Sequence, residues 1–298
     1  MRDGARMHTQ SPETKALRNQ IVSYAIERMD LDPAPLDAPQ TKSWLDQNVP
    51  ATITEDGLGG AKALEVFGEL LAPATISTDH PNFLSFIPNA PSEAATFFDL
   101  VVSASSIYGG SWMEGSGAVY AENQVLEFLA SEVGLPNGAG GLFVQGGTLG
   151  NLSALVTARE VFRANNNVSP TELLAVVCSK EAHSSLKAVA KVMNIELIKA
   201  EVDDQGKLTG ASVEKALTEA KNRVFAVVAT AGTTNFGIVD RISEIAEVTR
   251  PHSLWLHIDG AYGLAGILDP ATRDLFAGIE NCDSFIVDPH KWLYAPFD

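Results

Sequence analysis

Lys291 stands where its side-chain amine could act as a nucleophile. It follows the apolar run SFIVDPH, so it lies at the end of a predicted buried strand, beside His290. Burial and a neighbouring cation both favour the neutral, nucleophilic amine. The alternative is a surface lysine whose aliphatic stem lies along the domain edge. Trp292 directly after it favours partial burial.

Asp259 and His183 also follow apolar runs. Asp259 ends LWLHID, where a carboxylate is costly to bury unless it is paired. It could cap a helix, form a loop salt bridge, or pair with a buried cation such as a protonated ring nitrogen. His183 follows LLAVVCS; taken alone, it is typical of a helix-capping or hydrogen-bonded loop residue.

A glycine-rich turn occupies residues 145–151, QGGTLGN. Gly146 and Gly147 allow a tight turn, and the N–H groups of a helix that starts there could bind one phosphate. Many such turns are only turns. The segment has neither the G-x-G-x-x-G spacing of dinucleotide-binding proteins nor a following Gly-Lys-Ser/Thr. This argues against a nucleotide-dependent dehydrogenase, in which Lys291 would also have no role.

These groups together match the three requirements of pyridoxal phosphate. That cofactor needs an anion site for its phosphate, an acid for its pyridine nitrogen and a lysine for its aldehyde. The glycine turn, Asp259 and Lys291 would supply them in turn. We therefore predict a pyridoxal 5'-phosphate site, with no metal.

A mostly parallel α/β sheet must position these groups. From about Gly140, short runs rich in Val, Ile and Leu alternate with helical patterns, which is typical of a sheet covered by helices on both faces. In such folds the ligand lies outside the carboxyl ends of the strands. Strands are predicted at 141–145, 173–179, 195–202, 224–232, 254–261 and 284–289. Helices are predicted at 149–162, 184–193, 211–222 and 242–250.

The N-terminal part, residues 1–78, reads as a helical segment that precedes a larger domain at 79–298. Spacings of three and four place one set of side chains on a single helix face: Leu17, Ile21, Tyr24, Ala25 and Met29. A second helical pattern covers 61–72, and a Pro-rich loop follows.

Composition narrows the class of protein. The formal charge of −16 disfavours nucleic acid and anionic membranes as partners. The two cysteines, Cys178 and Cys282, lie in or beside apolar runs and are expected to be buried free thiols. The N-terminus lacks the apolar core of a signal peptide, and no run reaches transmembrane length, so we expect a cytoplasmic protein.

The chain resembles the group II pyridoxal-phosphate-dependent amino-acid decarboxylases, which include aromatic-amino-acid and glutamate decarboxylases. The resemblance runs from the N-terminal helix to the last residue. Its most specific segments are HIDGAY (257–262) and DPHKW (288–292). It is also carried by HPNFLSFIP (80–88), AENQVLEFLASEVGLP (121–136), QGGTLGNLSAL (145–155), EAHSSLKA (181–188) and ATAGTT (229–234). It implies the large domain of pyridoxal-phosphate fold type I.

The resemblance implies a role for each matching residue. Lys291 would form the Schiff base, Asp259 would pair with the pyridine nitrogen, and His183 would stack on the ring and help in protonation or in orienting the substrate carboxylate. The other cofactor-binding residues would be Ala261 against the opposite ring face, Thr230 near the phenolic oxygen, and Gly147 and Thr148 at the phosphate, helped by Asp288 or His290. Phe86, Ile87, Pro88 and Asn89 would line the substrate entrance, reaching into a partner subunit's site.

The implied activity is decarboxylation of an L-amino acid to the amine and carbon dioxide by a homodimer. Two departures bear on it: aromatic-amino-acid members usually carry Thr where Asn89 stands and Asn where Asp288 stands. Family members also continue with a mobile loop and a small C-terminal domain after the segment matched here, so we expect this chain to decarboxylate poorly. The alternatives are an aminotransferase, an amino-acid lyase, an aldehyde-forming decarboxylase, or an inactive product that acts as a binding or dimer partner.

Overall fold

The computed structural model describes residues 10–297, which form two compact units. The first unit ends at Glu93 and the second begins at Ala94. The sequence-based division lay between residues 78 and 79. The proline-rich loop between these two positions belongs to the first unit.

The described part of the first unit is built from helices. α1 (Pro12–Met29) begins behind Ser11, whose hydroxyl accepts the Thr14 N–H in a capping box. α2 (Lys42–Asn48) and α3 (Gly60–Val66) follow, and α3 continues as the π-helix η2 (Phe67–Leu71). The helices predicted around 17–29 and 61–72 are confirmed.

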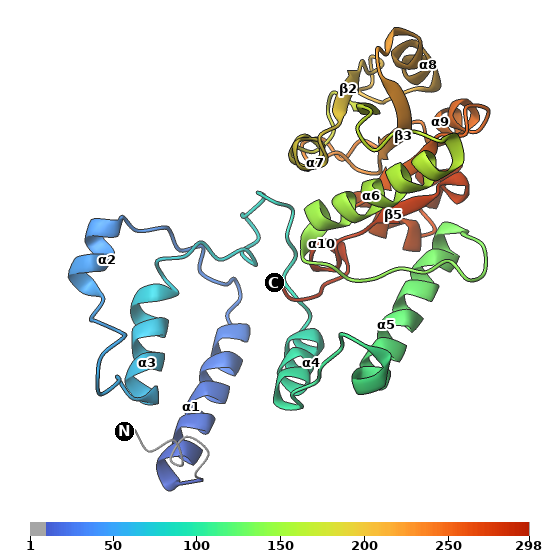
Figure 1. Ribbon diagram of the computed structural model, residues 1–298. Coiled ribbons are helices and arrows are strands. Elements are labelled where there is room, and N and C mark those ends of the chain that lie inside the picture. Colours follow the sequence, from blue (N-terminus) through green and yellow to red (C-terminus); the bar gives the residue numbers. More distant parts are fainter. Residues whose placement is uncertain (1–9, 298) are drawn as a thin grey trace. The chain divides into compact units, whose positions relative to one another are not determined.

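The second unit contains a five-stranded sheet in which all strands are parallel (Figure 1). Its strand order is β2-β1-β3-β4-β5. The strands are β1 (Leu174–Ser179), β2 (Glu196–Ala200), β3 (Arg223–Thr230), β4 (Trp255–Asp259) and β5 (Ser284–Ile286). The predicted α/β class with a parallel sheet is therefore confirmed.

Helices cover both faces of this sheet. α6 (Gly146–Asn166) and α7 (Ser185–Met193) pack on one face, and α8 (Gly210–Glu219) and α9 (Ile242–Thr249) pack on the other. Residues of β1 alternate between the two cores: Val176 joins the α6–α7 core and Val177 the α8–α9 core. This two-sided burial is why the strands read as continuous apolar runs.

The remaining elements lie in the second unit or, for α4, begin at its boundary with the first. They are α4 (Glu93–Ala104), α5 (Trp112–Val133), the 3₁₀ helices η3 (Gly263–Leu268), η4 (Arg273–Phe276) and η5 (Ile279–Asn281), and α10 (Pro289–Trp292). Cys178 and Cys282 are buried free thiols, as expected, and burial raises the pKa of each to about 12. None of the helices in residues 10–297 is long and apolar enough to cross a membrane.

The predicted strand at 141–145 is wrong. This segment has no strand structure and leads directly into α6. Leu142 and Phe143 are exposed, and the Phe143 N–H donates to the Glu122 carboxylate of α5 at 2.8 Å instead of to a neighbouring strand. A short apolar run satisfies the pattern of a strand, but a strand also needs a hydrogen-bonding neighbour, which the pattern does not reveal.

Candidate active site

The candidate site lies at the carboxyl edge of the sheet. The last residues of β3 and β4, Thr230 and Asp259, pair with each other, and Asp259 pairs with Ile286 at the end of β5. His183 follows β1, and Lys291 follows β5. The sheet thus brings together groups separated by more than a hundred positions in sequence, at the edge where parallel α/β folds bind ligands.

Asp259 is a buried carboxylate with two hydrogen-bond donors. Its Oδ2 accepts the Asn151 amide N–H at 3.0 Å, and its Oδ1 accepts the Ala261 backbone N–H at 3.3 Å. Only 5% of Asp259 is exposed. Its carboxylate is therefore held in one orientation, with lone pairs left for a further donor.

Lys291 lies on the single turn of α10, with its side chain largely buried. Its Nζ is 3.1 Å from Asp288 Oδ2, and His290 Nε2 is 4.0 Å from the same oxygen. The Asp288 N–H donates to the Ala261 carbonyl at 3.2 Å, which links the Lys291 turn to the turn after Asp259. The predicted nucleophile and the predicted ring partner thus share one connected framework.

The glycine turn forms the start of α6. Gly146 has φ +76°, which favours glycine, and no side chain caps the N–H groups of the first turn. A Cβ added to Gly147 would lie 3.1 Å from Asp288 Oδ1 and 3.2 Å from Ala261 Cβ. A side chain at Gly147 would therefore fill the space beside the Lys291 and Asp259 turns. Thr148, the next residue, is exposed.

Thr230 carries a buried hydroxyl without a hydrogen-bond partner. In residues 10–297, only Thr230 Oγ1 and Arg163 Nε are buried side-chain polar atoms of this kind. Burying an unsatisfied hydroxyl costs roughly 1–3 kcal/mol. This cost is explained if a ligand at the end of β3 forms a hydrogen bond with Thr230.

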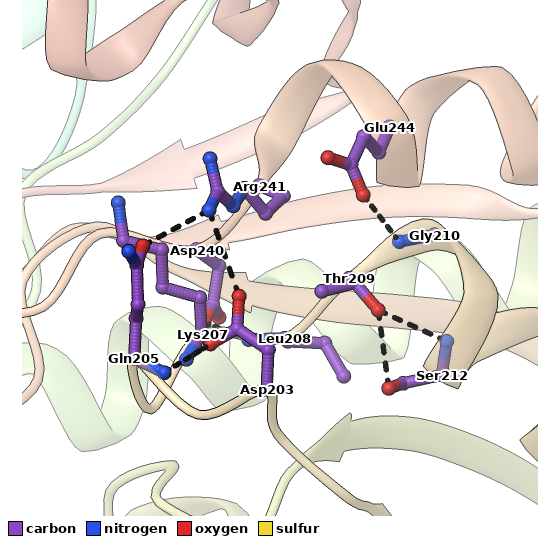
Figure 2. A network of polar contacts seen from close by, with 10 residues as sticks. All are labelled: Asp203, Gln205, Lys207, Leu208, Thr209, Gly210, Ser212, Asp240, Arg241 and Glu244. Atoms are coloured by element: carbon purple, nitrogen blue, oxygen red, sulfur yellow. Dashed lines mark hydrogen bonds and ion pairs between the residues drawn. The ribbon is translucent and has the colours of Figure 1, made fainter.

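Asp240 fixes the backbone at this point. Its carboxylate accepts the N–H groups of Thr230 and Leu208, each at 2.7 Å. Figure 2 shows Asp240 with Leu208 and the surrounding network of Asp203, Lys207 and Arg241. Burial raises the pKa of Asp240 to about 6, while these two backbone donors act in the opposite direction.

His183 is exposed at the same edge. Its Nδ1 lies 2.9 Å from Ser185 Oγ and accepts the Ser185 N–H at 3.2 Å. Ser185 is in turn bonded to Asn151, which also contacts Asp259. His183 is therefore linked to the Asp259 carboxylate indirectly, through Ser185 and Asn151.

Three polar residues of the site were not predicted: Asn151, Ser185 and His257. His257 is fully buried, and burial lowers its pKa to about 4. The sequence did contain an indication of the role of His257. It lies two residues before Asp259 in an apolar strand, and therefore on the same side of the sheet. Asn151 lies one helical turn after Gly147, on the same side of α6.

The four residues expected at the substrate entrance lie in the first unit. Phe86 and Ile87 have the left-handed backbone angles φ +65° and +54°, and the Phe83 and Phe86 rings are 5.9 Å apart. Pro88 and Asn89, which follow them, are half-buried. Their role at the site stays a prediction.

A family model described as "pyridoxal-dependent decarboxylase conserved domain" matches residues 46–298. The chain belongs to this family. It is 31% identical over 293 residues to an aromatic-L-amino-acid decarboxylase of Bacillus atrophaeus, covering 96% of this chain and 60% of that protein. An L-2,4-diaminobutyrate decarboxylase of Acinetobacter baumannii is 28% identical, covering 81% of this chain and 52% of that protein.

A crystal structure of Rhodiola rosea 4-hydroxyphenylacetaldehyde synthase has a similar fold. Its TM-score is 0.84 and its identity 26%, covering all of this chain and 65% of that one. The chain thus spans about three fifths of the length of the first curated relative it matches.

Pyridoxal phosphate is the cofactor of the pyridoxal-dependent decarboxylases, and the residues present fit it. The unpaired Thr230 hydroxyl, the amine of Lys291 and the carboxylate of Asp259 are the polar groups that its ring requires. The uncapped N–H groups at the start of α6 suit its phosphate.

Proposed function

We propose that this chain is the cofactor-binding part of a decarboxylase that converts an L-amino acid to the amine and carbon dioxide, with Lys291 bonded to the cofactor's aldehyde. The observation that carries the proposal is the buried, unpaired hydroxyl of Thr230, which lies on the strand next to Asp259. A hydroxyl buried without a partner makes sense when a ligand supplies one.

Each residue then has a defined task. Asp259 would hold a proton at the ring nitrogen, and Thr230 would donate to the phenolic oxygen. Gly147, Thr148 and the first turn of α6 would hold the phosphate, with His290 close by. Ala261 and His183 would lie against the ring. When bound, the cofactor supplies an electron sink for the bond that breaks at the substrate Cα.

The reaction breaks the bond between Cα and the carboxylate. Carbon dioxide leaves and a proton is added at Cα, so the site must hold a proton close to that atom. His183, at the exposed edge, and Lys291, once its amine is free, are the candidates. Phe86, Ile87, Pro88 and Asn89 would shape the entrance for the substrate side chain.

A second candidate is an aldehyde-forming decarboxylation, which also consumes dioxygen and water and releases ammonia and hydrogen peroxide. The similarity to 4-hydroxyphenylacetaldehyde synthase, at a TM-score of 0.84, favours keeping it. The products separate the two: amine formation supports the first reaction, and aldehyde formation supports the second. Carbon dioxide release from carboxyl-labelled L-amino acids, compared with keto-acid formation, separates both from an aminotransferase.

We also propose that the protein is a homodimer. α4 is mostly apolar, yet none of its residues is buried in this chain, and Phe98, Val101 and Val102 are exposed. A cytoplasmic location stays a prediction from the two free thiols and the N-terminal sequence.

The central experiment tests Lys291. Pyridoxal phosphate added to the purified chain should produce visible absorbance, and borohydride reduction followed by peptide mapping should place the cofactor on Lys291. Lys291→Ala should lose the absorbance, while Lys180→Ala, which removes an exposed lysine paired with Glu201, should keep it. Visible absorbance retained in Lys291→Ala, or a label on another lysine, would refute the assignment.

A further inference from the structure

A continuous chain of hydrogen bonds runs beneath the candidate site. Trp255 Nε1 lies 2.8 Å from Ser284 Oγ, which lies 2.8 Å from His257 Nδ1. His257 Nε2 lies 2.9 Å from Asn151 Oδ1. Asn151 Nδ2 then branches to Asp259 Oδ2 at 3.0 Å and to Ser185 Oγ at 3.1 Å.

The chemistry of Asp259 fixes the direction of the first branch. A carboxylate only accepts hydrogen bonds, so the Asn151 amide must present its NH₂ group to Asp259 and its oxygen to His257. An amide oxygen also only accepts, so His257 carries its proton on Nε2. Its Nδ1 is then bare and accepts the Ser284 hydroxyl, whose oxygen accepts the Trp255 N–H.

The second branch is directed in the same way. Asn151 donates to Ser185 Oγ, which leaves the Ser185 hydroxyl free to donate to His183 Nδ1 at 2.9 Å. The Ser185 backbone N–H donates to the same nitrogen at 3.2 Å. A neutral His183 therefore carries its proton on Nε2, away from this network.

Burial makes these bonds persistent. Asn151 is 1% exposed and His257 0% exposed, so neither side chain can exchange its partners for water. Burial also lowers the pKa of His257 to about 4, which keeps it neutral near pH 7. An unsatisfied polar atom here is costly, so each member depends on the others.

We infer that Asn151 is a positioning residue: its amide holds the Asp259 carboxylate in place for the cofactor and, through its oxygen, sets which nitrogen of His257 is protonated. The inference about cofactor binding rests on the proposed function. The inference about His257 does not, because it follows from hydrogen bonds within the chain.

The first test reads the protonated nitrogen of His257 by ¹⁵N NMR of the chain without cofactor, at neutral pH. The chain has six histidines, so single replacements can assign the signals. The unchanged chain should show a proton on His257 Nε2 and a bare Nδ1. In Asn151→Leu, which keeps the volume but removes both polar atoms, the proton should move to Nδ1, where Ser284 can accept it.

The second test uses Asn151→Asp to distinguish the role of the amide oxygen, which contacts His257, from that of the NH₂ group, which contacts Asp259. The new carboxylate still accepts from His257, so Nε2 should keep its proton. Its other oxygen faces Asp259, and two carboxylates this close share one proton, which weakens the negative charge that Asp259 would offer to the ring nitrogen. Pyridoxal phosphate, titrated by its visible absorbance, should therefore bind roughly tenfold or more weakly in both Asn151→Leu and Asn151→Asp.

Leu155→Ala is the matched control, because Leu155 lies one turn further along α6 and is buried without polar contacts. It should lower the melting temperature without changing the His257 signal or the cofactor affinity. An unchanged His257 signal in Asn151→Leu would overturn the inference. So would unchanged cofactor affinity in both Asn151 variants. Failure of the unchanged chain to bind cofactor would instead count against the proposed function, and the NMR result would still decide the His257 part.

Discussion

Replacing Thr230 should change the stability of the chain and its affinity for pyridoxal phosphate in opposite directions. Thr230→Val keeps the shape and removes a hydroxyl that is buried without a partner. The free energy of unfolding without cofactor should rise by about 1 kcal/mol, because a buried unsatisfied group is lost. Affinity for pyridoxal phosphate should fall roughly tenfold, because the ring loses a donor. Urea unfolding and absorbance titration measure the two effects.

Thr233→Val is the control for this experiment. Thr233 is equally buried, but its Oγ1 accepts the Ile238 N–H at 3.2 Å. The same substitution should therefore destabilise the chain by about 1 kcal/mol. A loss of stability in Thr230→Val would show that its hydroxyl has a partner after all.

The sequence was informative for residues that act at strand ends and less so for those that support them. Lys291 and Asp259 could be selected because a lysine or carboxylate after an apolar run is unusual in itself. Asn151 could not, since its role depends on contacts with His257 and Asp259, more than a hundred positions away. An asparagine inside a helix carries no local sign that the fold will place a carboxylate beside it.

At the scale of elements, Asp240 joins the end of β3 to the segment before α8 and should make stability depend on pH. Its pKa is about 6 in the folded chain and near 3.8 when exposed. The folded state therefore binds the proton more tightly. The stabilisation is fully present below about pH 4 and is lost as the pH rises through 6. The loss is on the order of 3 kcal/mol.

Unfolding by urea between pH 4 and pH 7 tests this expectation. The stability of the unchanged chain relative to Asp240→Asn should decrease as the pH rises. Asp203, in the same network, gives a control of opposite sign: the Lys207 backbone N–H lowers its pKa, so its contribution is lost as the pH falls. A pH-independent difference between the unchanged chain and Asp240→Asn would contradict the buried, titrating carboxylate.

Most elements could be predicted because local pattern and burial agree. The strands from β1 to β5 appeared near their expected places, and β1, β2 and β3 are each followed by one of the predicted helices. The segment 141–145 failed because only its composition resembled a strand. Whether a neighbour exists for it to pair with is a property of the whole sheet, which no short window of sequence contains.

For the whole molecule, net charge and local charge have different consequences. The formal charge of −16 repels a phosphate at long range. The carboxyl edge of the sheet is a local exception to this negative field, because it carries Lys291, His290 and the start of α6. The Asp288 carboxylate lies among these groups. Cofactor binding should therefore depend on short-range contacts, which salt screens less than it screens the overall field.

The apolar side chains of α4 give a prediction about assembly. Phe98 and Val102 lie one turn apart and are exposed in a helix that buries none of its residues. We expect a second copy of the chain to cover these apolar side chains. The double variant Phe98→Glu/Val102→Glu should weaken dimerisation by roughly 30-fold or more, because charges would be buried at the interface. Val192→Glu, at an exposed position on α7, should leave it unchanged. Sedimentation at several concentrations measures the equilibrium, and identical behaviour of the α4 variant and the unchanged chain would place the subunit contact elsewhere.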